Sequence, residues 1–188
     1  MKIGITGGIG SGKSYVCKLL SRHGIQVYDC DAAAKRLMQT SPALRQQLTA
    51  LIGAEAYDAS CRLNKAVVAR FLLSSETHAK AIDDIVHPAV FADFKNSGYQ
   101  WMESAILYES GADSLVDRVV VVTAPEALRI ARVMRRDGIS HEKALEWIGR
   151  QWPQDEVRRR ADYEIINDGI TDLEQQINNI IQLCKTPF

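Results

Sequence analysis

A glycine-rich run near the start of the chain constrains the fold more than any other feature. The stretch GITGGIGSGKSYV, from Gly4 to Val16, places five glycines within nine residues. A turn needs one or two glycines, whereas a backbone that closely approaches an anion needs several. Residues 7–14, GGIGSGKS, match the pattern G-x-x-x-x-G-K-[ST] in full. An apolar segment precedes the run and an amphipathic segment follows it, so the sequence predicts a strand, a loop and a helix in succession.

This glycine loop, residues 7–14, is typical of a nucleoside triphosphate site. Glycines allow the backbone N–H groups to turn inward around an anion, and the start of the following helix adds the positive end of its dipole. Lys13 is predicted to reach the β- and γ-phosphates, and the Ser14 hydroxyl is predicted to coordinate Mg²⁺. A glycine-rich turn without a ligand is the alternative. The flanking strand and helix favour phosphate binding.

Net charge and cysteine usage bear on the class of protein. The 188 residues carry 23 Lys and Arg against 23 Asp and Glu, so an anion site has to be local, and we expect no nucleic-acid or membrane partner. The four cysteines form no CxxC pair, which predicts free thiols rather than disulfides or a zinc site, and Cys17 and Cys30 lie in segments expected to be buried. We find no basic leader and no apolar run of about 18 residues, so we expect a cytoplasmic protein.

Predicted strands alternate with predicted helices along most of the chain. The strands are expected at residues 2–6, 25–29, 101–107, 118–123 and 163–166, and the helices at 13–23, 125–136, 140–151 and 172–183. This alternation predicts an α/β fold, with a parallel sheet and helices on both faces. Arg118 to Thr123 is so uniformly β-branched that we expect it to be buried on both faces. Residues 30–97 are mostly helical, with breaks near 41–42, 53 and 64, and form a predicted insertion beside the sheet.

Two carboxylates, Asp29 and Asp31, stand where the second predicted strand meets its loop. Side chains two apart on a strand share a face, and ligands bind at the carboxyl ends of parallel strands. One carboxylate near a γ-phosphate can accept the proton of an attacking hydroxyl while its neighbour orders metal-bound water. The alternative is that Asp31 caps the helix that follows.

Three arginines, at positions 129, 132 and 136, fall on one face of the helix predicted at 125–136. They predict either a lid that closes over the phosphates and neutralises transition-state charge, or an ordinary solvated basic face. Glu109 is placed as a strand-end carboxylate that could hold metal-bound water or substrate. His87, before Pro88, favours a local structural role.

Together these residues resemble the dephospho-coenzyme A kinase family. The shared motifs follow in order along nearly the whole chain: TGGIGSGKS at 6–14, D-x-D at 29–31, His-Pro at 87–88, an apolar strand that ends in Tyr-Glu at 108–109, R-x-x-x-R-D-G at 132–138, Gln151, Ala-Asp at 161–162 and Ile-x-Asn-x-Gly at 165–169. The resemblance implies a P-loop nucleoside-kinase-like fold. Its parallel sheet would be flanked by helices and would carry a helical acceptor-binding insertion and a lid.

The resemblance also implies an activity and a division of the chain. The activity is ATP-dependent phosphorylation of the ribose 3′-hydroxyl of dephospho-CoA, the last step of coenzyme A synthesis, with Mg²⁺ as cofactor. Residues 1–188 would form a single kinase domain. Its core would comprise residues 1–31, 98–124 and 161–188, its acceptor-binding region residues 32–97 and its lid residues 125–160. The expected partners are ATP and dephospho-CoA, and the expected state is a monomer or weak homo-oligomer.

Individual roles follow from the same resemblance. Asp31 would be the general base, Lys13 and Arg136 would complete the catalytic set, and Asp31 would also reach the metal through water. The residues expected on ATP are Gly8, Ile9, Gly10, Ser11, Gly12, Lys13, Ser14, Tyr15, Arg132 and Asn167. The residues expected on the acceptor are Thr6, Asp29, Lys65, His87 and Glu109.

The chain departs from the family pattern at three places, and three rival functions are open to it. Tyr15 replaces a common threonine, AILYE (105–109) replaces Pro-Leu-Leu-Phe-Glu, and CRLNK (61–65) replaces Gly-x-Leu-Asp-Arg, so that Lys65 stands where arginine is usual. Lysine cannot form the bidentate fork of arginine.

Another P-loop small-molecule kinase, such as one for shikimate, is the nearest rival. A GTP switch and a nucleic-acid ATPase are disfavoured, because the chain has neither Asn-Lys-x-Asp nor an excess of basic residues.

Overall fold

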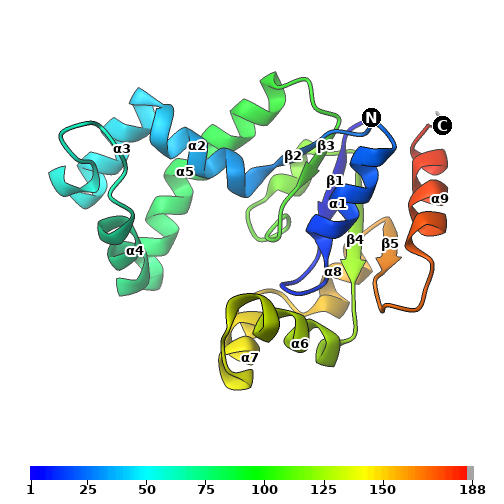
Figure 1. The fold of residues 1–188 in the computed structure, drawn as a ribbon. Helices are drawn as coiled ribbons and strands as arrows, with labels where there is room; N and C mark the ends of the chain where they lie inside the picture. Colours follow the sequence, from blue (N-terminus) through cyan, green and yellow to red (C-terminus); the bar gives the residue numbers. More distant parts are fainter. Residues whose placement is uncertain (186–188) are drawn as a thin grey trace. The chain divides into compact units, whose positions relative to one another are not determined.

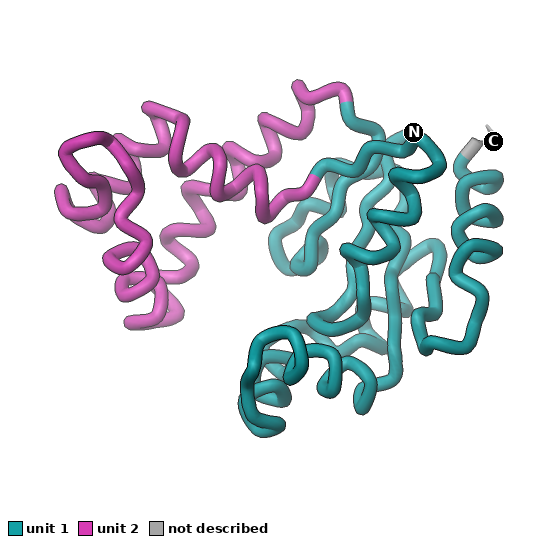
Figure 2. The backbone as a smooth tube through the Cα atoms, in the orientation of Figure 1, with its two compact units in different colours: residues 1–28, 99–188 teal, residues 29–98 magenta. Residues whose placement is uncertain are grey.

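The chain forms two compact units in the computed structural model, which describes residues 1–185 (Figures 1 and 2). The core unit contains residues 1–28 and the chain from residue 99 onward. The helical unit contains residues 29–98. Within the described part of the chain, no helix is both long enough and apolar enough to cross a membrane.

A five-stranded sheet organises the core unit. Its strands are β2 (Val27–Asp29), β3 (Trp101–Glu103), β1 (Ile3–Thr6), β4 (Arg118–Thr123) and β5 (Tyr163–Ile166), in this spatial order. β1 pairs in parallel with β3 and β4, and β4 pairs in parallel with β5. The predicted α/β class with a parallel sheet is therefore confirmed. β4 is buried from its second residue to its last, as its β-branched composition predicts.

Helices α1 (Lys13–Arg22) and α9 (Leu173–Lys185) pack against one face of the sheet (Figure 1). Their apolar side chains join those of the strands in one cluster, which includes Ile3, Ile5, Val16, Leu20, Val122, Ile165 and Ile177. On the other face, a Cβ at Gly4 would lie 3.0 Å from Leu107, so the turn after β3 packs directly on β1. α8 (Gln154–Arg160) contributes the buried Val157 beside β4.

Helices α6 (Glu126–Asp137) and α7 (His141–Gly149) follow β4 in the chain. The short 3₁₀ helix η2 (Ala112–Leu115) precedes that strand. Ile130 and Val133 of α6 and Ala144 of α7 form a second buried cluster, against which Ile9 of the glycine loop packs. Residues 125–160 are therefore joined to the loop by apolar contact.

The helical unit contains α2 (Cys30–Thr40), α3 (Pro42–Ile52), the 3₁₀ helix η1 (Ala54–Ala56), α4 (Lys65–Ser74) and α5 (Glu76–Asn96). Each of its α-helices begins at a side chain that accepts a hydrogen bond from the first turn; these caps are Asp29, Ser41, Asn64 and Ser75. The predicted breaks near residues 41–42, 53 and 64 are confirmed. The break at Ser75 was not predicted, although serine is a typical helix cap.

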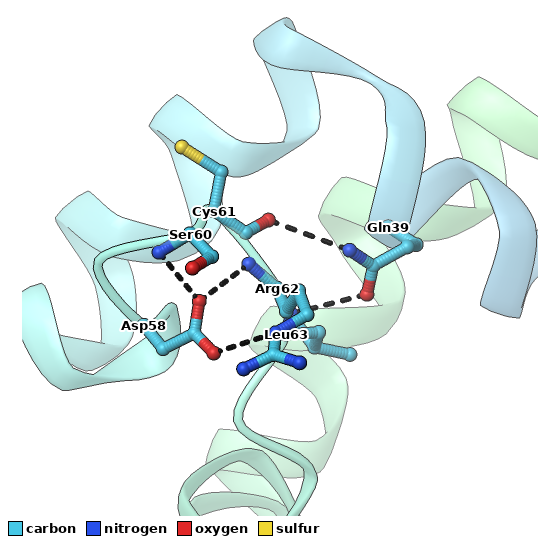
Figure 3. A network of polar contacts seen from close by, with 6 residues as sticks. All are labelled: Gln39, Asp58, Ser60, Cys61, Arg62 and Leu63. Carbon is cyan, nitrogen blue, oxygen red and sulfur yellow. Dashed lines mark hydrogen bonds and ion pairs between the residues drawn. The ribbon is translucent and has the colours of Figure 1, made fainter.

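A hairpin between η1 and α4 is held by the polar network in Figure 3. Asp58 accepts hydrogen bonds from the N–H groups of Ser60 and Arg62, and also from Nε of Arg62 at 2.9 Å. Gln39 of α2 donates to the Cys61 carbonyl and accepts from the Leu63 N–H. The network fixes the chain just before α4. It holds Cys61 at φ +59°, a left-handed conformation that residues with a Cβ rarely adopt.

Several sequence-based boundaries are wrong. The strand expected at 101–107 ends at Glu103, because residues 105–110 form a turn, although the N–H of Ser104 still bonds to the Ile5 carbonyl of β1. The strand expected from residue 25 begins at Val27, since the Ile25 N–H is still bonded to the end of α1. All four cysteines are free thiols, as predicted, but Cys17 is only half-buried.

Candidate active site

The glycine loop, residues 7–14, joins β1 to α1 and is packed against α6. A Cβ at Gly10 would lie 2.5 Å from the backbone oxygen of Arg129, and φ is +80° at this residue. A Cβ at Gly12, where φ is +94°, would lie 2.1 Å from Nδ2 of Asn167. Both positions therefore need glycine for two reasons, close approach and left-handed backbone. The conformation of the loop is therefore fixed by its packing against neighbouring residues.

The start of α1 differs from the starts of the helices in the helical unit. No side chain caps it, and the preceding Gly12 has none to offer. The first N–H groups of a helix have no intrahelical partners, and together with the dipole they attract anions. Lys13 and Ser14 are the first two residues of α1, and Lys13 is only 9% exposed. The structure thus brings the predicted phosphate-binding residues together at one helix end.

Lys13 lies opposite a carboxylate that was not predicted as a site residue. Its Nζ is 3.8 Å from Oε1 of Glu103, the last residue of β3, and both side chains are largely buried. β3 is adjacent to β1, and Ile5 pairs in register with Glu103. Glu103 was predicted to lie in mid-strand. The signal that could have found it is an acidic residue at the carboxyl end of a strand next to the loop.

Arg132 of α6 and Asn167, just after β5, bind the glycine loop from outside. Nη1 of Arg132 donates to the carbonyls of Gly10 and Ser11 at 3.3 Å each, and Nη2 donates to Oδ1 of Asn167 at 3.2 Å. Nδ2 of Asn167 in turn donates to the Ser11 carbonyl at 2.8 Å. Because Arg132 bonds to the loop, the alternative of an ordinary solvated basic face is wrong for this arginine.

Arg129, one turn earlier on α6, is also attached to the loop. Its Nε donates to the Ile9 carbonyl at 2.9 Å, and the residue is 4% exposed. Burial lowers the pKa of this guanidinium, and the charge of Glu126 partly offsets that effect. The Ile9 N–H donates to Oε1 of Gln151 at 2.6 Å. From the sequence, Arg129 was predicted only as one of three arginines on a lid or a solvated face, and Gln151 only as part of the ordered family motifs. No contact with the loop was predicted for either.

Arg136 lies elsewhere. It is at the exposed end of α6 and forms an ion pair with its neighbour Asp137, with Nη2 and Oδ2 2.7 Å apart. Hydrogen bonds from the guanidinium lower the pKa of Asp137, and the same bonds raise the pKa of Arg136. Of the three arginines predicted to share a face, two contact the loop carbonyls and this one pairs locally.

Two residues expected on the acceptor side belong to the core unit. Thr6 is the buried last residue of β1. Glu109 is exposed and accepts a hydrogen bond from the backbone N–H of Trp152 at 3.2 Å. Thr6 therefore stands at the carboxyl end of β1, and Glu109 lies in the turn that follows the neighbouring strand β3.

The prediction that Asp29 and Asp31 share a strand face is wrong. Asp29 ends β2 and caps α2, since its Oδ1 accepts from the Ala32 N–H at 2.8 Å. Asp31 lies in the first turn of α2, where its side chain is exposed. The suggestion that Asp31 is the cap is therefore wrong, and Asp29 has that role.

Lys65 and His87 both belong to the helical unit. Lys65 is the exposed first residue of α4. His87 precedes Pro88 inside α5, with its Nε2 3.6 Å from Asp83 and its ring stacked on Phe91. Within residues 1–185, no three His, Cys, Asp or Glu side chains gather as a metal-ligand set.

Comparison with known proteins decides the family. The family model described as dephospho-CoA kinase matches residues 1–172. The chain belongs to the dephospho-CoA kinase family. It is 42% identical over 192 residues to a dephospho-CoA kinase of Bacteroides fragilis, an alignment that covers 96% of this chain and 91% of that protein. The resemblance stated from the ordered motifs is therefore confirmed.

Solved structures share the fold of this chain. The Thermus thermophilus protein TT1252 is 32% identical, with a TM-score of 0.85 over all of this chain and 98% of that one. A shikimate kinase of Acinetobacter baumannii is 16% identical, with a TM-score of 0.58. The match covers 97% of this chain and 92% of that one. At that identity the second likeness concerns the fold alone, which is the P-loop kinase-like fold predicted from the sequence.

Proposed function

We propose that this chain transfers the γ-phosphoryl group of ATP to the ribose 3′-hydroxyl of dephospho-CoA, the final step of coenzyme A biosynthesis. The family match over residues 1–172 carries this conclusion. The loop geometry supports it, because Lys13 is buried at an uncapped helix start that is suited to phosphates. The enzyme is a phosphotransferase with an alcohol group as acceptor.

On the ATP side, the loop from Gly8 to Tyr15 wraps the triphosphate, and Lys13 neutralises the β- and γ-phosphates. Before the nucleotide binds, Lys13 is balanced by Glu103 at 3.8 Å. Arg132 and Asn167 hold the loop through its carbonyls. Arg132 is proposed to act on the phosphates, and the segment from Asn167 to Gly169 is proposed to lie near the adenine. Arg136, at the exposed end of the 125–160 segment, remains the proposed lid arginine. Its pair with Asp137 would have to open for that role.

Mg²⁺ fits the oxygen atoms around the loop. The ion keeps several waters and is usually held by substrate phosphates with one or two protein oxygens, so a dedicated protein cage is not needed. Ser14 offers a hydroxyl in the first turn of α1, and Glu103 offers a carboxylate at the end of the neighbouring strand. Asp31 would act through an ordered water. When bound, the ion supplies charge neutralisation for the moving phosphoryl group.

On the acceptor side, Asp31 takes the proton from the ribose hydroxyl as that oxygen attacks in line. Its exposed position at the start of α2 leaves the carboxylate accessible to a substrate. Thr6, Asp29, Lys65, His87 and Glu109 are proposed to bind the acceptor. The helical region 32–97 would present dephospho-CoA, and residues 125–160 would act as the lid of a single kinase domain.

The setting of the enzyme is proposed from its composition. Four free thiols are typical of a reducing compartment, which favours the cytoplasm. Equal numbers of basic and acidic residues give no reason to expect a nucleic-acid partner. We propose a monomer or weak homo-oligomer, which light scattering coupled to size-exclusion chromatography would test.

A coupled ADP-release assay tests the function. Mg-ATP is offered with dephospho-CoA, shikimate, AMP or CMP in parallel, and the product mass is measured. We expect ADP release only with dephospho-CoA, and one added phosphoryl group on that acceptor. Turnover with shikimate or a nucleotide in its place would favour the rival, another P-loop small-molecule kinase.

Two variants separate the proposed roles of Asp31 and Lys13. Asp31→Asn should lower kcat by at least about 100-fold with nearly unchanged ATP affinity, because it removes a general base but no phosphate contact. Lys13→Ala should instead weaken nucleotide binding itself. Titration calorimetry with a non-hydrolysable ATP analogue measures the second effect. Retained turnover in Asp31→Asn would remove this residue from the base role.

A further inference from the structure

The third residue of the glycine loop, Ile9, is held on both sides of its backbone by side chains from residues 125–160. Its N–H donates to Oε1 of Gln151 at 2.6 Å, and its C=O accepts from Nε of Arg129 at 2.9 Å. Its side chain packs against the apolar cluster of α6 and α7. The backbone of Ile9 is therefore positioned by groups outside the loop.

Gln151 uses both ends of its amide. While Oε1 accepts from Ile9, Nε2 donates to the carbonyl of Ala105 at 3.1 Å, in the turn that follows β3. A side-chain amide carries both an acceptor and a donor, so it can accept from one backbone group and donate to another, which an apolar side chain or an ionised carboxylate cannot do. One side chain thus joins the phosphate loop to the segment that begins at Glu103, the partner of Lys13.

Arg129 adds charge at the same place. Its guanidinium lies against the loop, since a Cβ at Gly8 would be 2.3 Å from Nη2. The carboxylate whose charge acts on it belongs to Glu126, at the exposed start of the same helix. A buried cation is costly unless a counter-charge is near. A triphosphate on the loop would supply that counter-charge.

We propose that Gln151 and Arg129 are positioning residues for phosphoryl transfer, which fix the Ile9 peptide and thereby align the loop with the γ-phosphate. The proposal rests on the proposed function. Its energetic basis is that small misplacements of groups around a reacting phosphoryl cost rate rather than ground-state affinity. Residues 125–160 would then set the shape of the phosphate loop through two side chains.

The first test compares Gln151→Leu with Gln154→Leu. Gln154 is a matched control, because its Oε1 accepts from the N–H of Ala124, a residue outside the loop, at 3.1 Å. Gln151→Leu should lower kcat about tenfold or more, with the KM for dephospho-CoA changed less than about threefold. Gln154→Leu should leave kcat near that of wild type. Equal kcat losses in the two variants, or melting-temperature loss with unchanged kcat in Gln151→Leu, would overturn the proposal.

A second variant covers the case in which Gln151→Leu folds poorly. Gln151→Glu keeps an oxygen for the Ile9 N–H but cannot donate to Ala105, so it should retain the fold and lose part of kcat.

A separate pair of variants tests the charge of Arg129. Arg129→Lys keeps the charge and Arg129→Met removes it. We expect kcat to follow the order wild type, Lys, Met. Equal kcat in the Lys and Met variants would refute the charge contribution.

Hydrogen exchange supplies a readout that does not depend on the acceptor. Peptides covering residues 7–13 should exchange faster in Gln151→Leu than in Gln154→Leu, and Mg-ADP should restore protection less completely in the former. If wild type failed to phosphorylate dephospho-CoA, the function would fall while this exchange result still stood. Unchanged exchange in residues 7–13 of Gln151→Leu would overturn the positioning role itself.

Discussion

The hydroxyl of Tyr108 is a single group that should lower the free energy of unfolding. It is buried without a hydrogen-bond partner, and its ring stacks on Trp152. An unsatisfied buried hydroxyl destabilises a fold by about 1–3 kcal/mol. Tyr108→Phe, the residue usual in the family, should raise the free energy of unfolding by about 1 kcal/mol in urea titration. Tyr57→Phe is the control and should be destabilising, since its hydroxyl donates to the Met38 carbonyl at 2.7 Å.

The same residue predicts an alkaline effect on stability. Burial, with the charges of Asp113 and Asp162 in support, raises the pKa of Tyr108 from 10.0 to about 12. Above pH 10 the unfolded chain releases this proton first, so the wild-type stability falls as pH rises from about 10 to about 12. Tyr108→Phe lacks the group and should show a smaller fall over that window. Identical pH dependence of the two proteins would refute the assignment.

Cys61 carries backbone strain in the hairpin of Figure 3, where φ is +59°. A residue with a Cβ pays about 1 kcal/mol in this conformation, and glycine avoids most of that cost. Cys61→Gly should therefore stabilise the protein by about 0.5–1 kcal/mol. Cys61→Ala removes the thiol but keeps the Cβ, so it should show no such gain. A gain in Ala equal to that in Gly would assign the effect to the thiol.

At the scale of elements, α2 depends on its first side chain. Asp29 accepts from the Ala32 N–H at 2.8 Å, and loss of such a cap costs about 1 kcal/mol. Asp29→Ala should therefore be destabilised by about that amount in thermal unfolding, whereas Asp29→Asn should remain near wild type. If Asp29 also binds the acceptor, Asp29→Asn should raise the KM for dephospho-CoA without loss of stability. Equal destabilisation in both variants would contradict the capping role.

Elements with a clear period or motif could be predicted from the sequence. The β-branched run of β4 and the loop-to-α1 unit are examples, because local composition determines them. The end of β3 could not be predicted. Leu107 is fully buried, but it packs on Gly4 from a turn rather than from a strand. An apolar run reports burial, and it does not distinguish a strand from a buried turn.

The candidate site shows the same limit. Lys13 and Ser14 come from one contiguous motif, which the sequence displays directly. The contact between Ile9 and Gln151 joins positions 142 apart, and neither residue type indicates a partner by itself. Arg132 could be assigned to a basic helix face, but its bonds to loop carbonyls depend on how α6 packs. Long-range polar pairs of this kind follow from tertiary packing.

At the scale of the whole molecule, most of the residues proposed to bind ATP lie in one unit, and several of those proposed to act on the acceptor lie in the other. The loop, Arg132 and Asn167 all lie in the core unit, whereas Asp31, Lys65 and His87 lie in the helical unit. A ligand stabilises the structure to which it binds by RT ln(1 + [L]/Kd), about 2.7 kcal/mol at 100 times Kd. Binding of each substrate should therefore leave its own pattern of protection along the chain.

Hydrogen exchange with one substrate at a time tests this division. A non-hydrolysable Mg-ATP analogue should slow exchange mainly in residues 1–28 and from 99 onward, because the phosphates order the loop and the start of α1. Dephospho-CoA should add protection within residues 29–98. Lys13→Ala should lose the first pattern and keep the second, since Lys13 is proposed to bind the phosphates of ATP and not the acceptor. Protection of residues 29–98 by the ATP analogue, with none from dephospho-CoA, would show that the helical unit is not the acceptor-binding region.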